Sequence, residues 1–311
     1  MKPITLQKYQ IRAQNFYMNH CGGEDPNSAQ ICAALLARCQ AYRPNAFSTL
    51  KSALAHDQLA RGNTQAAKAI CTLVNPVTAP GSVLSKKPKP RSVRSVSEEE
   101  FKELLGHLHT LEYFDEACSI VLAFYLGVRP CEMRTITVQG NQVSIIGGKK
   151  SAPLHRGADR TVTIETPYVL KSITVAAQWM SECERTNTAI RDRLRKECRA
   201  LWPRRKQHPT LKSFRHQLGS NLKASGESDA ALAYIMGHQS IDSISVYGNR
   251  RSGAGAKLHV KTAANADLSR VRQPRQPGAA GLGKVIARIE IPARLMRGAS
   301  ELTPGCSTKS Q

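Results

Sequence analysis

Three side chains in the second half of this 311-residue sequence, Arg215, His238 and Tyr247, have the types needed for chemistry at a phosphate. An arginine binds phosphate oxygens in a forked geometry that lysine does not match. A histidine can donate a hydrogen bond or move a proton, and a tyrosine hydroxyl can act as a nucleophile. Together these types suit phosphoryl transfer, provided that the fold brings them to one place.

Short helices are expected to position these side chains. Apolar residues recur at helical spacing over 214–222, which places Arg215 at the edge of a buried face, toward a cleft or solvent. A second apolar helix ends at the glycine directly before His238. Ser240 can cap a third short helix, whose last turn carries Tyr247.

The spacing of these residues resembles the active-site segment of the tyrosine recombinases, the lambda-integrase type of site-specific DNA recombinase. The family pattern is His-x-x-Arg, then Leu-Gly-His-x-Ser, then the nucleophilic tyrosine. Its counterparts here are Arg215, the run Met-Gly-His-Gln-Ser that contains His238, and Tyr247. The family's usual separations, 23 residues from arginine to histidine and nine from histidine to tyrosine, both recur. This joint spacing carries the resemblance, because any one of the residues alone would be uninformative.

A second motif, the sequence GVRPCE at residues 127–132, resembles the family's Gly-Leu-Arg-x-x-Glu box. The resemblance implies that Arg129 is the first catalytic arginine and that Glu132 is its acidic supporter. Taken alone, Arg-x-x-Glu is a common helix ion pair. Its weight therefore comes from its place upstream of the other motif.

A small hairpin follows this box. Three β-branched segments predict strands, at Thr135–Gln139, Gln142–Ile146 and Arg160–Ile164. The resemblance implies a catalytic lysine at this hairpin. Lys150 fits that position best and Lys149 is second, in a connection longer than the family's usual tight turn.

The resemblance implies a role for each of these side chains. Tyr247 would attack a DNA phosphate while Arg129 and Arg215 hold its non-bridging oxygens. His238 would add a hydrogen bond or act on the tyrosine proton, and Lys150 would protonate the departing 5′ oxygen. The product is a 3′-phosphotyrosine with a free 5′-hydroxyl, so the bond energy is kept and neither ATP nor a metal or other cofactor is expected. The sequence agrees, since it has no P-loop and no grouped metal ligands.

One position departs from the family pattern, because Lys212 stands where histidine is usual. A lysine can still donate to a phosphate oxygen, but it acts as a neutral base near pH 7 only if its pKa is lowered. His208 and His216 are nearby alternatives for this role.

Charge and cysteine content narrow the class of protein. The formal charge of +22 and the pI near 9.9 favour a polyanionic partner, here expected to be double-stranded DNA. The sequence has no apolar run long enough to predict a transmembrane helix, and its N-terminus has no apolar signal-peptide core. Its nine cysteines include no CxxC pair, which indicates reduced thiols in a cytoplasmic protein rather than a zinc site.

We expect a mainly α-helical protein with a small β-sheet in its catalytic domain, that is, an α+β fold. The expected parts are a helical core-binding domain at 1–78, a basic linker at 79–96, a catalytic tyrosine-recombinase domain at 97–257 and a flexible basic tail at 258–311. In the first part, helices are predicted at Thr5–Asn19, Ser28–Ala41, Ala46–Arg61 and Thr64–Val74. The linker residues expected to contact DNA phosphates are Lys86, Lys87, Lys89, Arg91 and Arg94.

In the catalytic part, a capping box at Ser97–Glu100 begins a helix, Phe114–Leu126 forms a buried helix, and a long helical region runs from Pro167 to about Trp202. The tail contains one apolar run, Val285–Leu295, which we expect to contact partner subunits. The alternative is a disordered basic tail that only contacts DNA.

These observations favour a site-specific DNA recombinase or integrase. The resemblance implies that protomers act in pairs at each DNA site and as a tetramer across two sites, and that they act at the nucleoid of a bacterium. A relaxing topoisomerase of the same chemistry is an alternative. Another is a catalytically inactive DNA-binding regulator, suggested by Lys212 and by the long hairpin connection.

Overall fold

The computed structural model describes residues 3–89, 91–148 and 159–273. The chain divides into two compact units, and the division falls after Arg91, inside the expected linker. Lys149 and Lys150, and the apolar run Val285–Leu295, lie outside the described residues.

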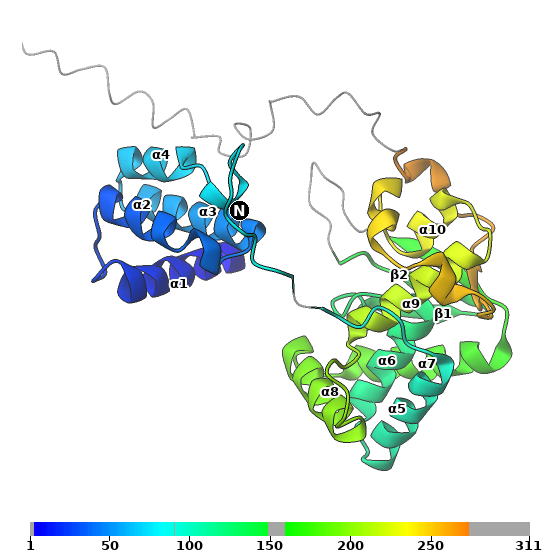
Figure 1. The fold of residues 1–311 in the computed structure, drawn as a ribbon. Helices are drawn as coiled ribbons and strands as arrows, with labels where there is room; N and C mark the ends of the chain where they lie inside the picture. Colours follow the sequence, from blue (N-terminus) through cyan, green and yellow to red (C-terminus); the bar gives the residue numbers. More distant parts are fainter. Residues whose placement is uncertain (1–2, 90, 149–158, 274–311) are drawn as a thin grey trace, which may run out of the picture. The chain divides into compact units, whose positions relative to one another are not determined.

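The first unit is helical (Figure 1). Its helices are α1 (Pro3–His20), α2 (Ser28–Ala37), α3 (Pro44–Ala60) and α4 (Thr64–Thr72), which lie where the sequence predicts helices. Asn27 and Gln30 form a capping box that begins α2, and Pro44 occupies the first turn of α3. The second predicted helix ends early, at Ala37, and a 3-10 turn at Cys39–Ala41 follows it.

The second unit surrounds a buried helix. Its helices are α5 (Glu98–Thr110), α6 (Phe114–Leu126), α7 (Pro167–Glu182), α8 (Asn187–Leu201), α9 (Leu211–Ala224) and α10 (Asp229–Ile235). Helix α6 packs against α5, α7, α8 and α9, and apolar residues cover most of its circumference, as expected of a core helix. The predicted capping box is present at the start of α5, where Ser97 Oγ accepts from Glu100 N at 3.2 Å and Glu100 Oε2 accepts from Ser97 N at 2.9 Å.

An antiparallel sheet completes this unit. Its strands are β1 (Ile136–Gln139), β2 (Gln142–Ile145), β3 (Arg160–Ile164) and β4 (Val260–Thr262), in that spatial order. The first three lie where the sequence predicts strands. Mainly helical structure with one small sheet is the fold class expected from the sequence, which is thereby confirmed.

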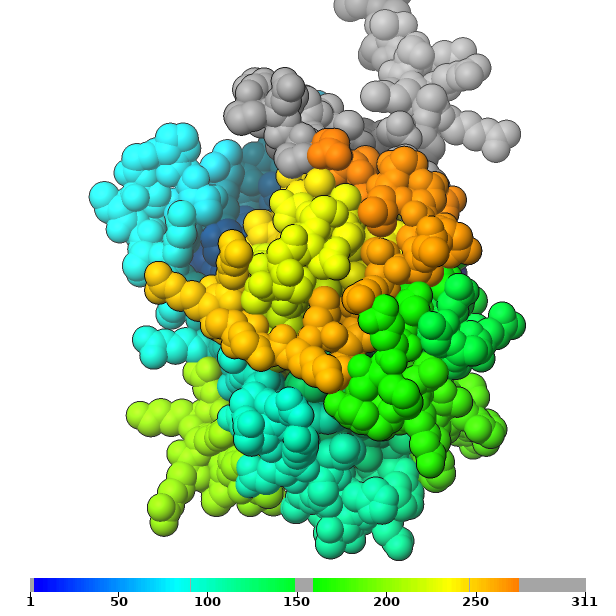
Figure 2. All heavy atoms as spheres, turned by 90° about the vertical axis from the view of Figure 1, so that its right-hand side faces the viewer, coloured from blue at the N-terminus to red at the C-terminus, as the bar shows by residue number. Residues whose placement is uncertain are grey.

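Strand β4 corrects the expectation that a flexible tail begins at residue 258. Val260 pairs with Ile164 on the open edge of β3, and its side chain is buried in the core. Further along, Arg272 N donates to Gln239 O at 3.0 Å, and Arg272 O accepts from Ile241 N at 3.2 Å. Figure 2 shows this segment in orange, beside the yellow surface near α10 and the green surface of the sheet. The segment folds here because it supplies backbone partners that the edge of β3 would otherwise lack.

Two other predicted helices differ in detail. The long helix expected over Pro167–Trp202 breaks between α7 and α8, where Arg134 donates to the carbonyl oxygens of Cys183 and Arg185. Thr186 then caps α8, its Oγ1 accepting from Ala189 N at 3.1 Å.

The short helix expected to carry Tyr247 in its last turn is a 3-10 helix, Ile241–Val246, and Tyr247 follows it in an extended conformation. Ser240 does not cap this helix, because its hydroxyl donates to Asp242 Oδ2 at 3.1 Å instead.

The cysteines of the described ranges form no disulfide. No helix there is long and apolar enough to cross a membrane.

Candidate active site

Arg215 lies at the centre of the candidate site, on α9. Only 3% of its surface is exposed, so the expected position at the edge of a buried face, toward a cleft or solvent, is wrong. Its guanidinium donates to the carbonyl oxygens of Gly127 and Met236 and to Nε2 of His238, the last at 2.9 Å. The two carbonyls belong to the C-terminal ends of α6 and α10. Because helix C-termini present unsatisfied carbonyls and partial negative charge, their convergence stabilises a buried cation.

Burial lowers the pKa of Arg215 but does not deprotonate it. Burial first, and then the nearby charges of Arg129 and Arg160, lower the pKa of Arg215 to about 10. The guanidinium is therefore still positively charged at neutral pH.

Two glycines in the left-handed conformation make this convergence possible. Gly127 (φ 59°) ends α6, and a Cβ there would lie 2.7 Å from Cδ2 of Leu218 on α9. Gly237 (φ 60°) follows α10, and a Cβ there would lie 2.5 Å from Nη1 of Arg160. Both positions need glycine for conformation and for space.

A second arginine is held by a buried carboxylate. Arg129 Nη1 donates to Glu132 Oε1 at 2.6 Å, and its backbone N donates to Oε2 at 3.0 Å. Arg129 Nη2 donates to Gly237 O at 3.3 Å, directly before His238. The predicted pairing of Arg129 with Glu132 is thus present, and it lies beside the Met-Gly-His-Gln-Ser run that contains His238.

The carboxylate of Glu132 also binds Arg160, a residue that the motif comparison missed. Arg160 Nη2 donates to Glu132 Oε2 at 3.1 Å, and neither side chain is exposed. Burial alone would raise the pKa of Glu132, but Arg160, Arg129 and the backbone hydrogen bond outweigh it and bring the pKa to about 2. The alternation of side chains along a strand could have indicated that Arg160 is buried, since it occupies the same inward face of β3 as Val162 and Ile164.

His238 is buried and neutral. Burial, then the charges of Arg215, Arg129 and Arg160, lower its pKa to about 3. Because an arginine only donates, Nε2 of His238 accepts from Arg215, and the neutral ring carries its proton on Nδ1. This Nδ1 is buried and has no hydrogen-bond partner in the described chain.

Tyr247 directly follows the 3-10 helix, and its ring packs on the other site residues. Its centroid lies 4.7 Å from the His216 ring, at an interplanar angle of 26°, and 4.8 Å from the His238 ring. Cζ of Arg215 lies 5.2 Å from the centroid of the same ring. A Cβ at Gly219 of α9 would be 3.3 Å from the Tyr247 Cβ, so a small residue there admits the tyrosine.

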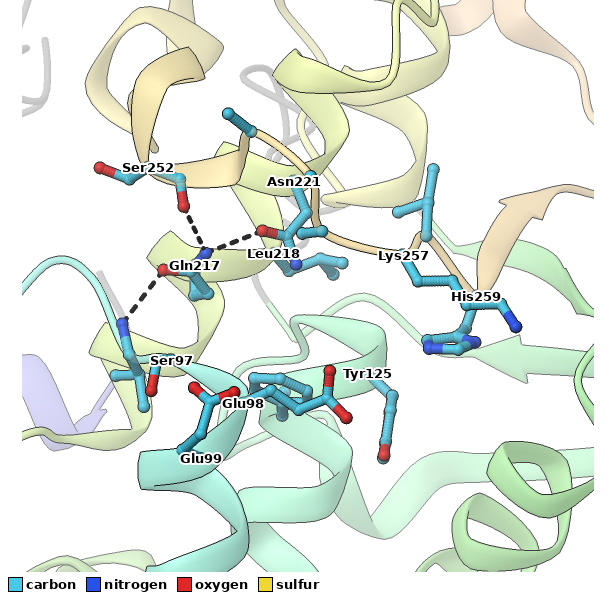
Figure 3. Close-up of a pocket in the computed structure, with 16 residues that line it drawn as sticks. Ser97, Glu98, Glu99, Tyr125, Gln217, Leu218, Asn221, Ser252, Lys257 and His259 are labelled. Atoms are coloured by element: carbon cyan, nitrogen blue, oxygen red, sulfur yellow. Dashed lines mark hydrogen bonds between the residues drawn. The ribbon is translucent and has the colours of Figure 1, made fainter.

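A glutamine on α9 ties the segment after Tyr247 to the start of this unit. Gln217 Nε2 donates to Ser252 O at 2.8 Å, and its Oε1 accepts from Val96 N at 3.1 Å. Figure 3 shows these contacts at the edge of a pocket of about 270 Å³ that also includes Glu98 and His259. One side chain thus connects the chain entering α5 with the chain leaving the tyrosine.

The other predicted site residues lie differently. Lys212 is exposed in the first turn of α9, and within the described ranges it makes no hydrogen bond or ion pair with the site. His208 bonds Trp202 O through Nε2 at 3.0 Å. His216, the other alternative named from the sequence, is buried against Tyr247.

The predicted DNA-contacting residues are distributed over both units. Lys86, Lys87 and Lys89 line a groove of about 1230 Å³ on the first unit, together with basic residues of the helices, Lys8, Arg12 and Arg43. Arg91 and Arg94 are exposed on either side of the division between the units. In the part of the chain that the structure describes, His, Cys, Asp and Glu side chains form no cluster that could hold a metal ion.

Solved integrase structures share this fold. A lambda integrase tetramer bound to a Holliday junction matches with a TM-score of 0.52 and 12% identity, over 83% of this chain and 75% of that chain. A DNA-bound lambda integrase fragment matches with a TM-score of 0.53 and 11% identity, over 83% and 91%. The Tn1549 transposon integrase with transposon right end DNA matches with a TM-score of 0.53 and 13% identity, over 83% and 91%.

At these identities the similarity establishes the fold, which is the one expected from the resemblance. No protein-family model matches the sequence, and no curated protein sequence matches it.

Proposed function

We propose that this protein is a tyrosine recombinase that cuts and rejoins DNA through a 3′-phosphotyrosyl intermediate. The observation that carries the proposal is the buried cluster around Tyr247, in which Arg215 and His238 contact its ring. Arg129 joins the cluster through the backbone of Gly237. The motif spacing and the integrase fold support the same function independently of this geometry.

The proposed reaction exchanges one phosphate ester for another. The Tyr247 hydroxyl oxygen forms a bond to phosphorus and releases its proton to solvent water, and the bond from phosphorus to the 5′ oxygen breaks. That oxygen takes a proton, for which Lys150 is the proposed donor. Rejoining reverses these steps, so no ATP is needed, and Arg129 and Arg215 supply the positive charge that a metal would otherwise provide.

The geometry favours one of the two roles considered for His238. Its pKa of about 3 makes the ring neutral at pH 7, and Nε2 already accepts from Arg215. We therefore assign Nδ1–H as a hydrogen-bond donor to a non-bridging phosphate oxygen. A role as acceptor of the tyrosine proton is disfavoured, because the remaining nitrogen carries a proton already.

The decisive experiment is covalent trapping on a nicked suicide DNA substrate. The wild-type protein should form a detergent-resistant adduct, and Tyr247→Phe should form none while binding DNA equally well. Tyr234→Phe is the matched control, since the Tyr234 hydroxyl is occupied in accepting from Thr161 N at 3.1 Å. An adduct formed by Tyr247→Phe would show that another residue is the nucleophile.

The exposed position of Lys212 favours a second candidate, a DNA-binding regulator without catalysis, because the site then lacks one of the family's polar groups. DNA binding by the wild-type protein without any adduct would support this candidate over the recombinase.

The finer part of the proposal concerns assembly and substrate. Site-specific recombination requires two DNA sites, and we propose a tetramer that joins them at the bacterial nucleoid. A topoisomerase of the same chemistry would relax supercoiled DNA without exchanging strands. Strand exchange between two labelled DNA sites therefore separates the recombinase from the topoisomerase.

A further inference from the structure

Arg160 is a fully buried arginine outside the motifs that point to catalysis. Its side chain has no exposed surface, and its described ion-pair partner is Glu132. Its Nε and Nη1 are buried and have no hydrogen-bond partner among the residues that the structure describes. A buried donor without an acceptor costs about 1–3 kcal/mol. The fold therefore retains a side chain that stability alone would not favour.

The contacts of Arg160 involve both partners of Arg129. Arg129 is held by the Glu132 carboxylate and by the carbonyl of Gly237. Arg160 donates to the same carboxylate at 3.1 Å. Its guanidinium also packs on Gly237, since Nη1 lies 2.5 Å and Cζ lies 2.9 Å from where a Cβ would be.

The charged groups around Arg160 determine the kind of ligand that this cluster favours. Glu132 is fully buried between Arg129 and Arg160, and Gly148 N also donates to it, at 3.2 Å. The guanidinium of Arg215 and the neutral His238 belong to the same cluster. Burial lowers the pKa of Arg160, whereas Glu132 and the hydroxyl of Tyr234 act to raise it. Arginine charge thus exceeds carboxylate charge among these groups, which suits the binding of an anion.

We propose that Arg160 is a positioning residue that fixes Arg129 by holding Glu132 and the backbone of Gly237 on its far side. Without it, Glu132 would keep one guanidinium instead of two and could change rotamer. Arg129 would then lose its fixed orientation toward the phosphate. This inference rests on the proposed function for its consequence in catalysis, but the contact between Arg160 and Glu132 does not.

The first test is a double-mutant cycle on single-turnover cleavage of suicide DNA. Arg160→Met should lower the cleavage rate at least about tenfold, with DNA affinity within about threefold of wild type. Combined with Arg129→Lys, it should add little to the loss caused by Arg129→Lys alone, because both act through the same guanidinium. If the fold losses of the two single variants multiply in the double variant, Arg160 acts independently of Arg129, and the proposal is overturned.

The second test measures the carboxylate directly, by ¹³C NMR of labelled glutamate with Glu132→Gln for assignment. The pKa of Glu132 should rise from about 2 by more than about one unit in Arg160→Met, because burial raises it and a large opposing charge is removed. In the same variant, the pH below which the cleavage rate falls should rise together with the pKa of Glu132. An unchanged pKa would overturn the proposal whatever the activity.

Two further variants keep these tests decisive. Arg160→Lys retains the charge if the methionine variant fails to fold, and it should show a smaller rise of the pKa and a partial loss of rate. Arg134→Met is the matched control, because the partners of Arg134 lie at Cys183, Arg185 and Asn187, and it should leave the Glu132 pKa unchanged. If the wild-type protein forms no DNA adduct, the proposed function fails, while the NMR measurement still reports on Arg160.

Discussion

The buried arginine cluster of the second unit and the basic groove of the first unit carry the same sign of charge in different surroundings. In the cluster, Arg215 and Arg160 are almost completely removed from solvent, and carbonyls or a carboxylate hold each of them. The groove residues Lys8, Arg12, Arg43, Lys86, Lys87 and Lys89 are all exposed.

This difference decides what each set of charges can do. A charge fixed in a low-dielectric interior acts strongly on charge that develops in a transition state. An exposed charge is screened within about 8–10 Å at ordinary salt and moves with its flexible side chain. The cluster should therefore control the rate of cleavage, and the groove should control affinity for DNA.

The largest effect is expected for Arg215→Lys and Arg129→Lys, which remove the forked guanidinium. Cleavage of suicide DNA should slow by about 100-fold or more, with little change in DNA affinity. Single-turnover rates and binding measured on the same DNA provide the check. A lysine variant within about tenfold of wild type would take that arginine out of the catalytic set.

The next effect concerns the stability of the cluster in acid. His238 has a folded-state pKa of about 3 against an ordinary value of 6.5, so its contribution is present above pH 6.5 and is lost as pH falls toward 3. At pH 5 the loss should be about 2 kcal/mol. Denaturant unfolding at pH 7 and pH 5 should show this loss in the wild-type protein and less of it in His238→Gln. His208→Gln is the control and should retain the full loss.

The groove and linker should show a different signature, a dependence on salt. Neutralising Lys86, Lys87, Lys89, Arg91 and Arg94 together should flatten the log–log salt dependence of DNA affinity by about 0.9 for each phosphate that these side chains no longer neutralise. The preferred DNA sequence should stay the same. A changed preference, measured by selection from a random pool, would mean that these residues contact bases.

The smallest effect is expected at Lys212, which is charged and exposed like the groove residues although it is close to Arg215 in sequence. Lys212→Ala should lower the cleavage rate less than about tenfold, that is, by under about 1.4 kcal/mol. A larger loss in single-turnover cleavage would show that Lys212 reaches the phosphate in the DNA complex. That result would mean that an exposed charge also controls the rate of cleavage, contrary to the difference expected between buried and exposed charges.

Local sequence patterns were sufficient for much of the fold and for part of the site. The capping box at Ser97, the glycine after α6 and the apolar periodicity of α9 are short-range signals, so helices could be placed from them. The pairing of Arg129 with Glu132 is also local, because it joins residues three positions apart. The spacing from Arg215 to Tyr247 indicated a phosphate site through resemblance, without any knowledge of packing.

Only the tertiary structure decided how the charges are held. Arg215 is buried because the C-terminal ends of α6 and α10 converge on it, and that convergence depends on how whole helices pack. Arg160 meets Glu132 across 28 residues of sequence, and β4 reaches β3 from about a hundred residues further along. Periodicity shows that a position faces inward, but its partner there is determined by the long-range contacts that close the core.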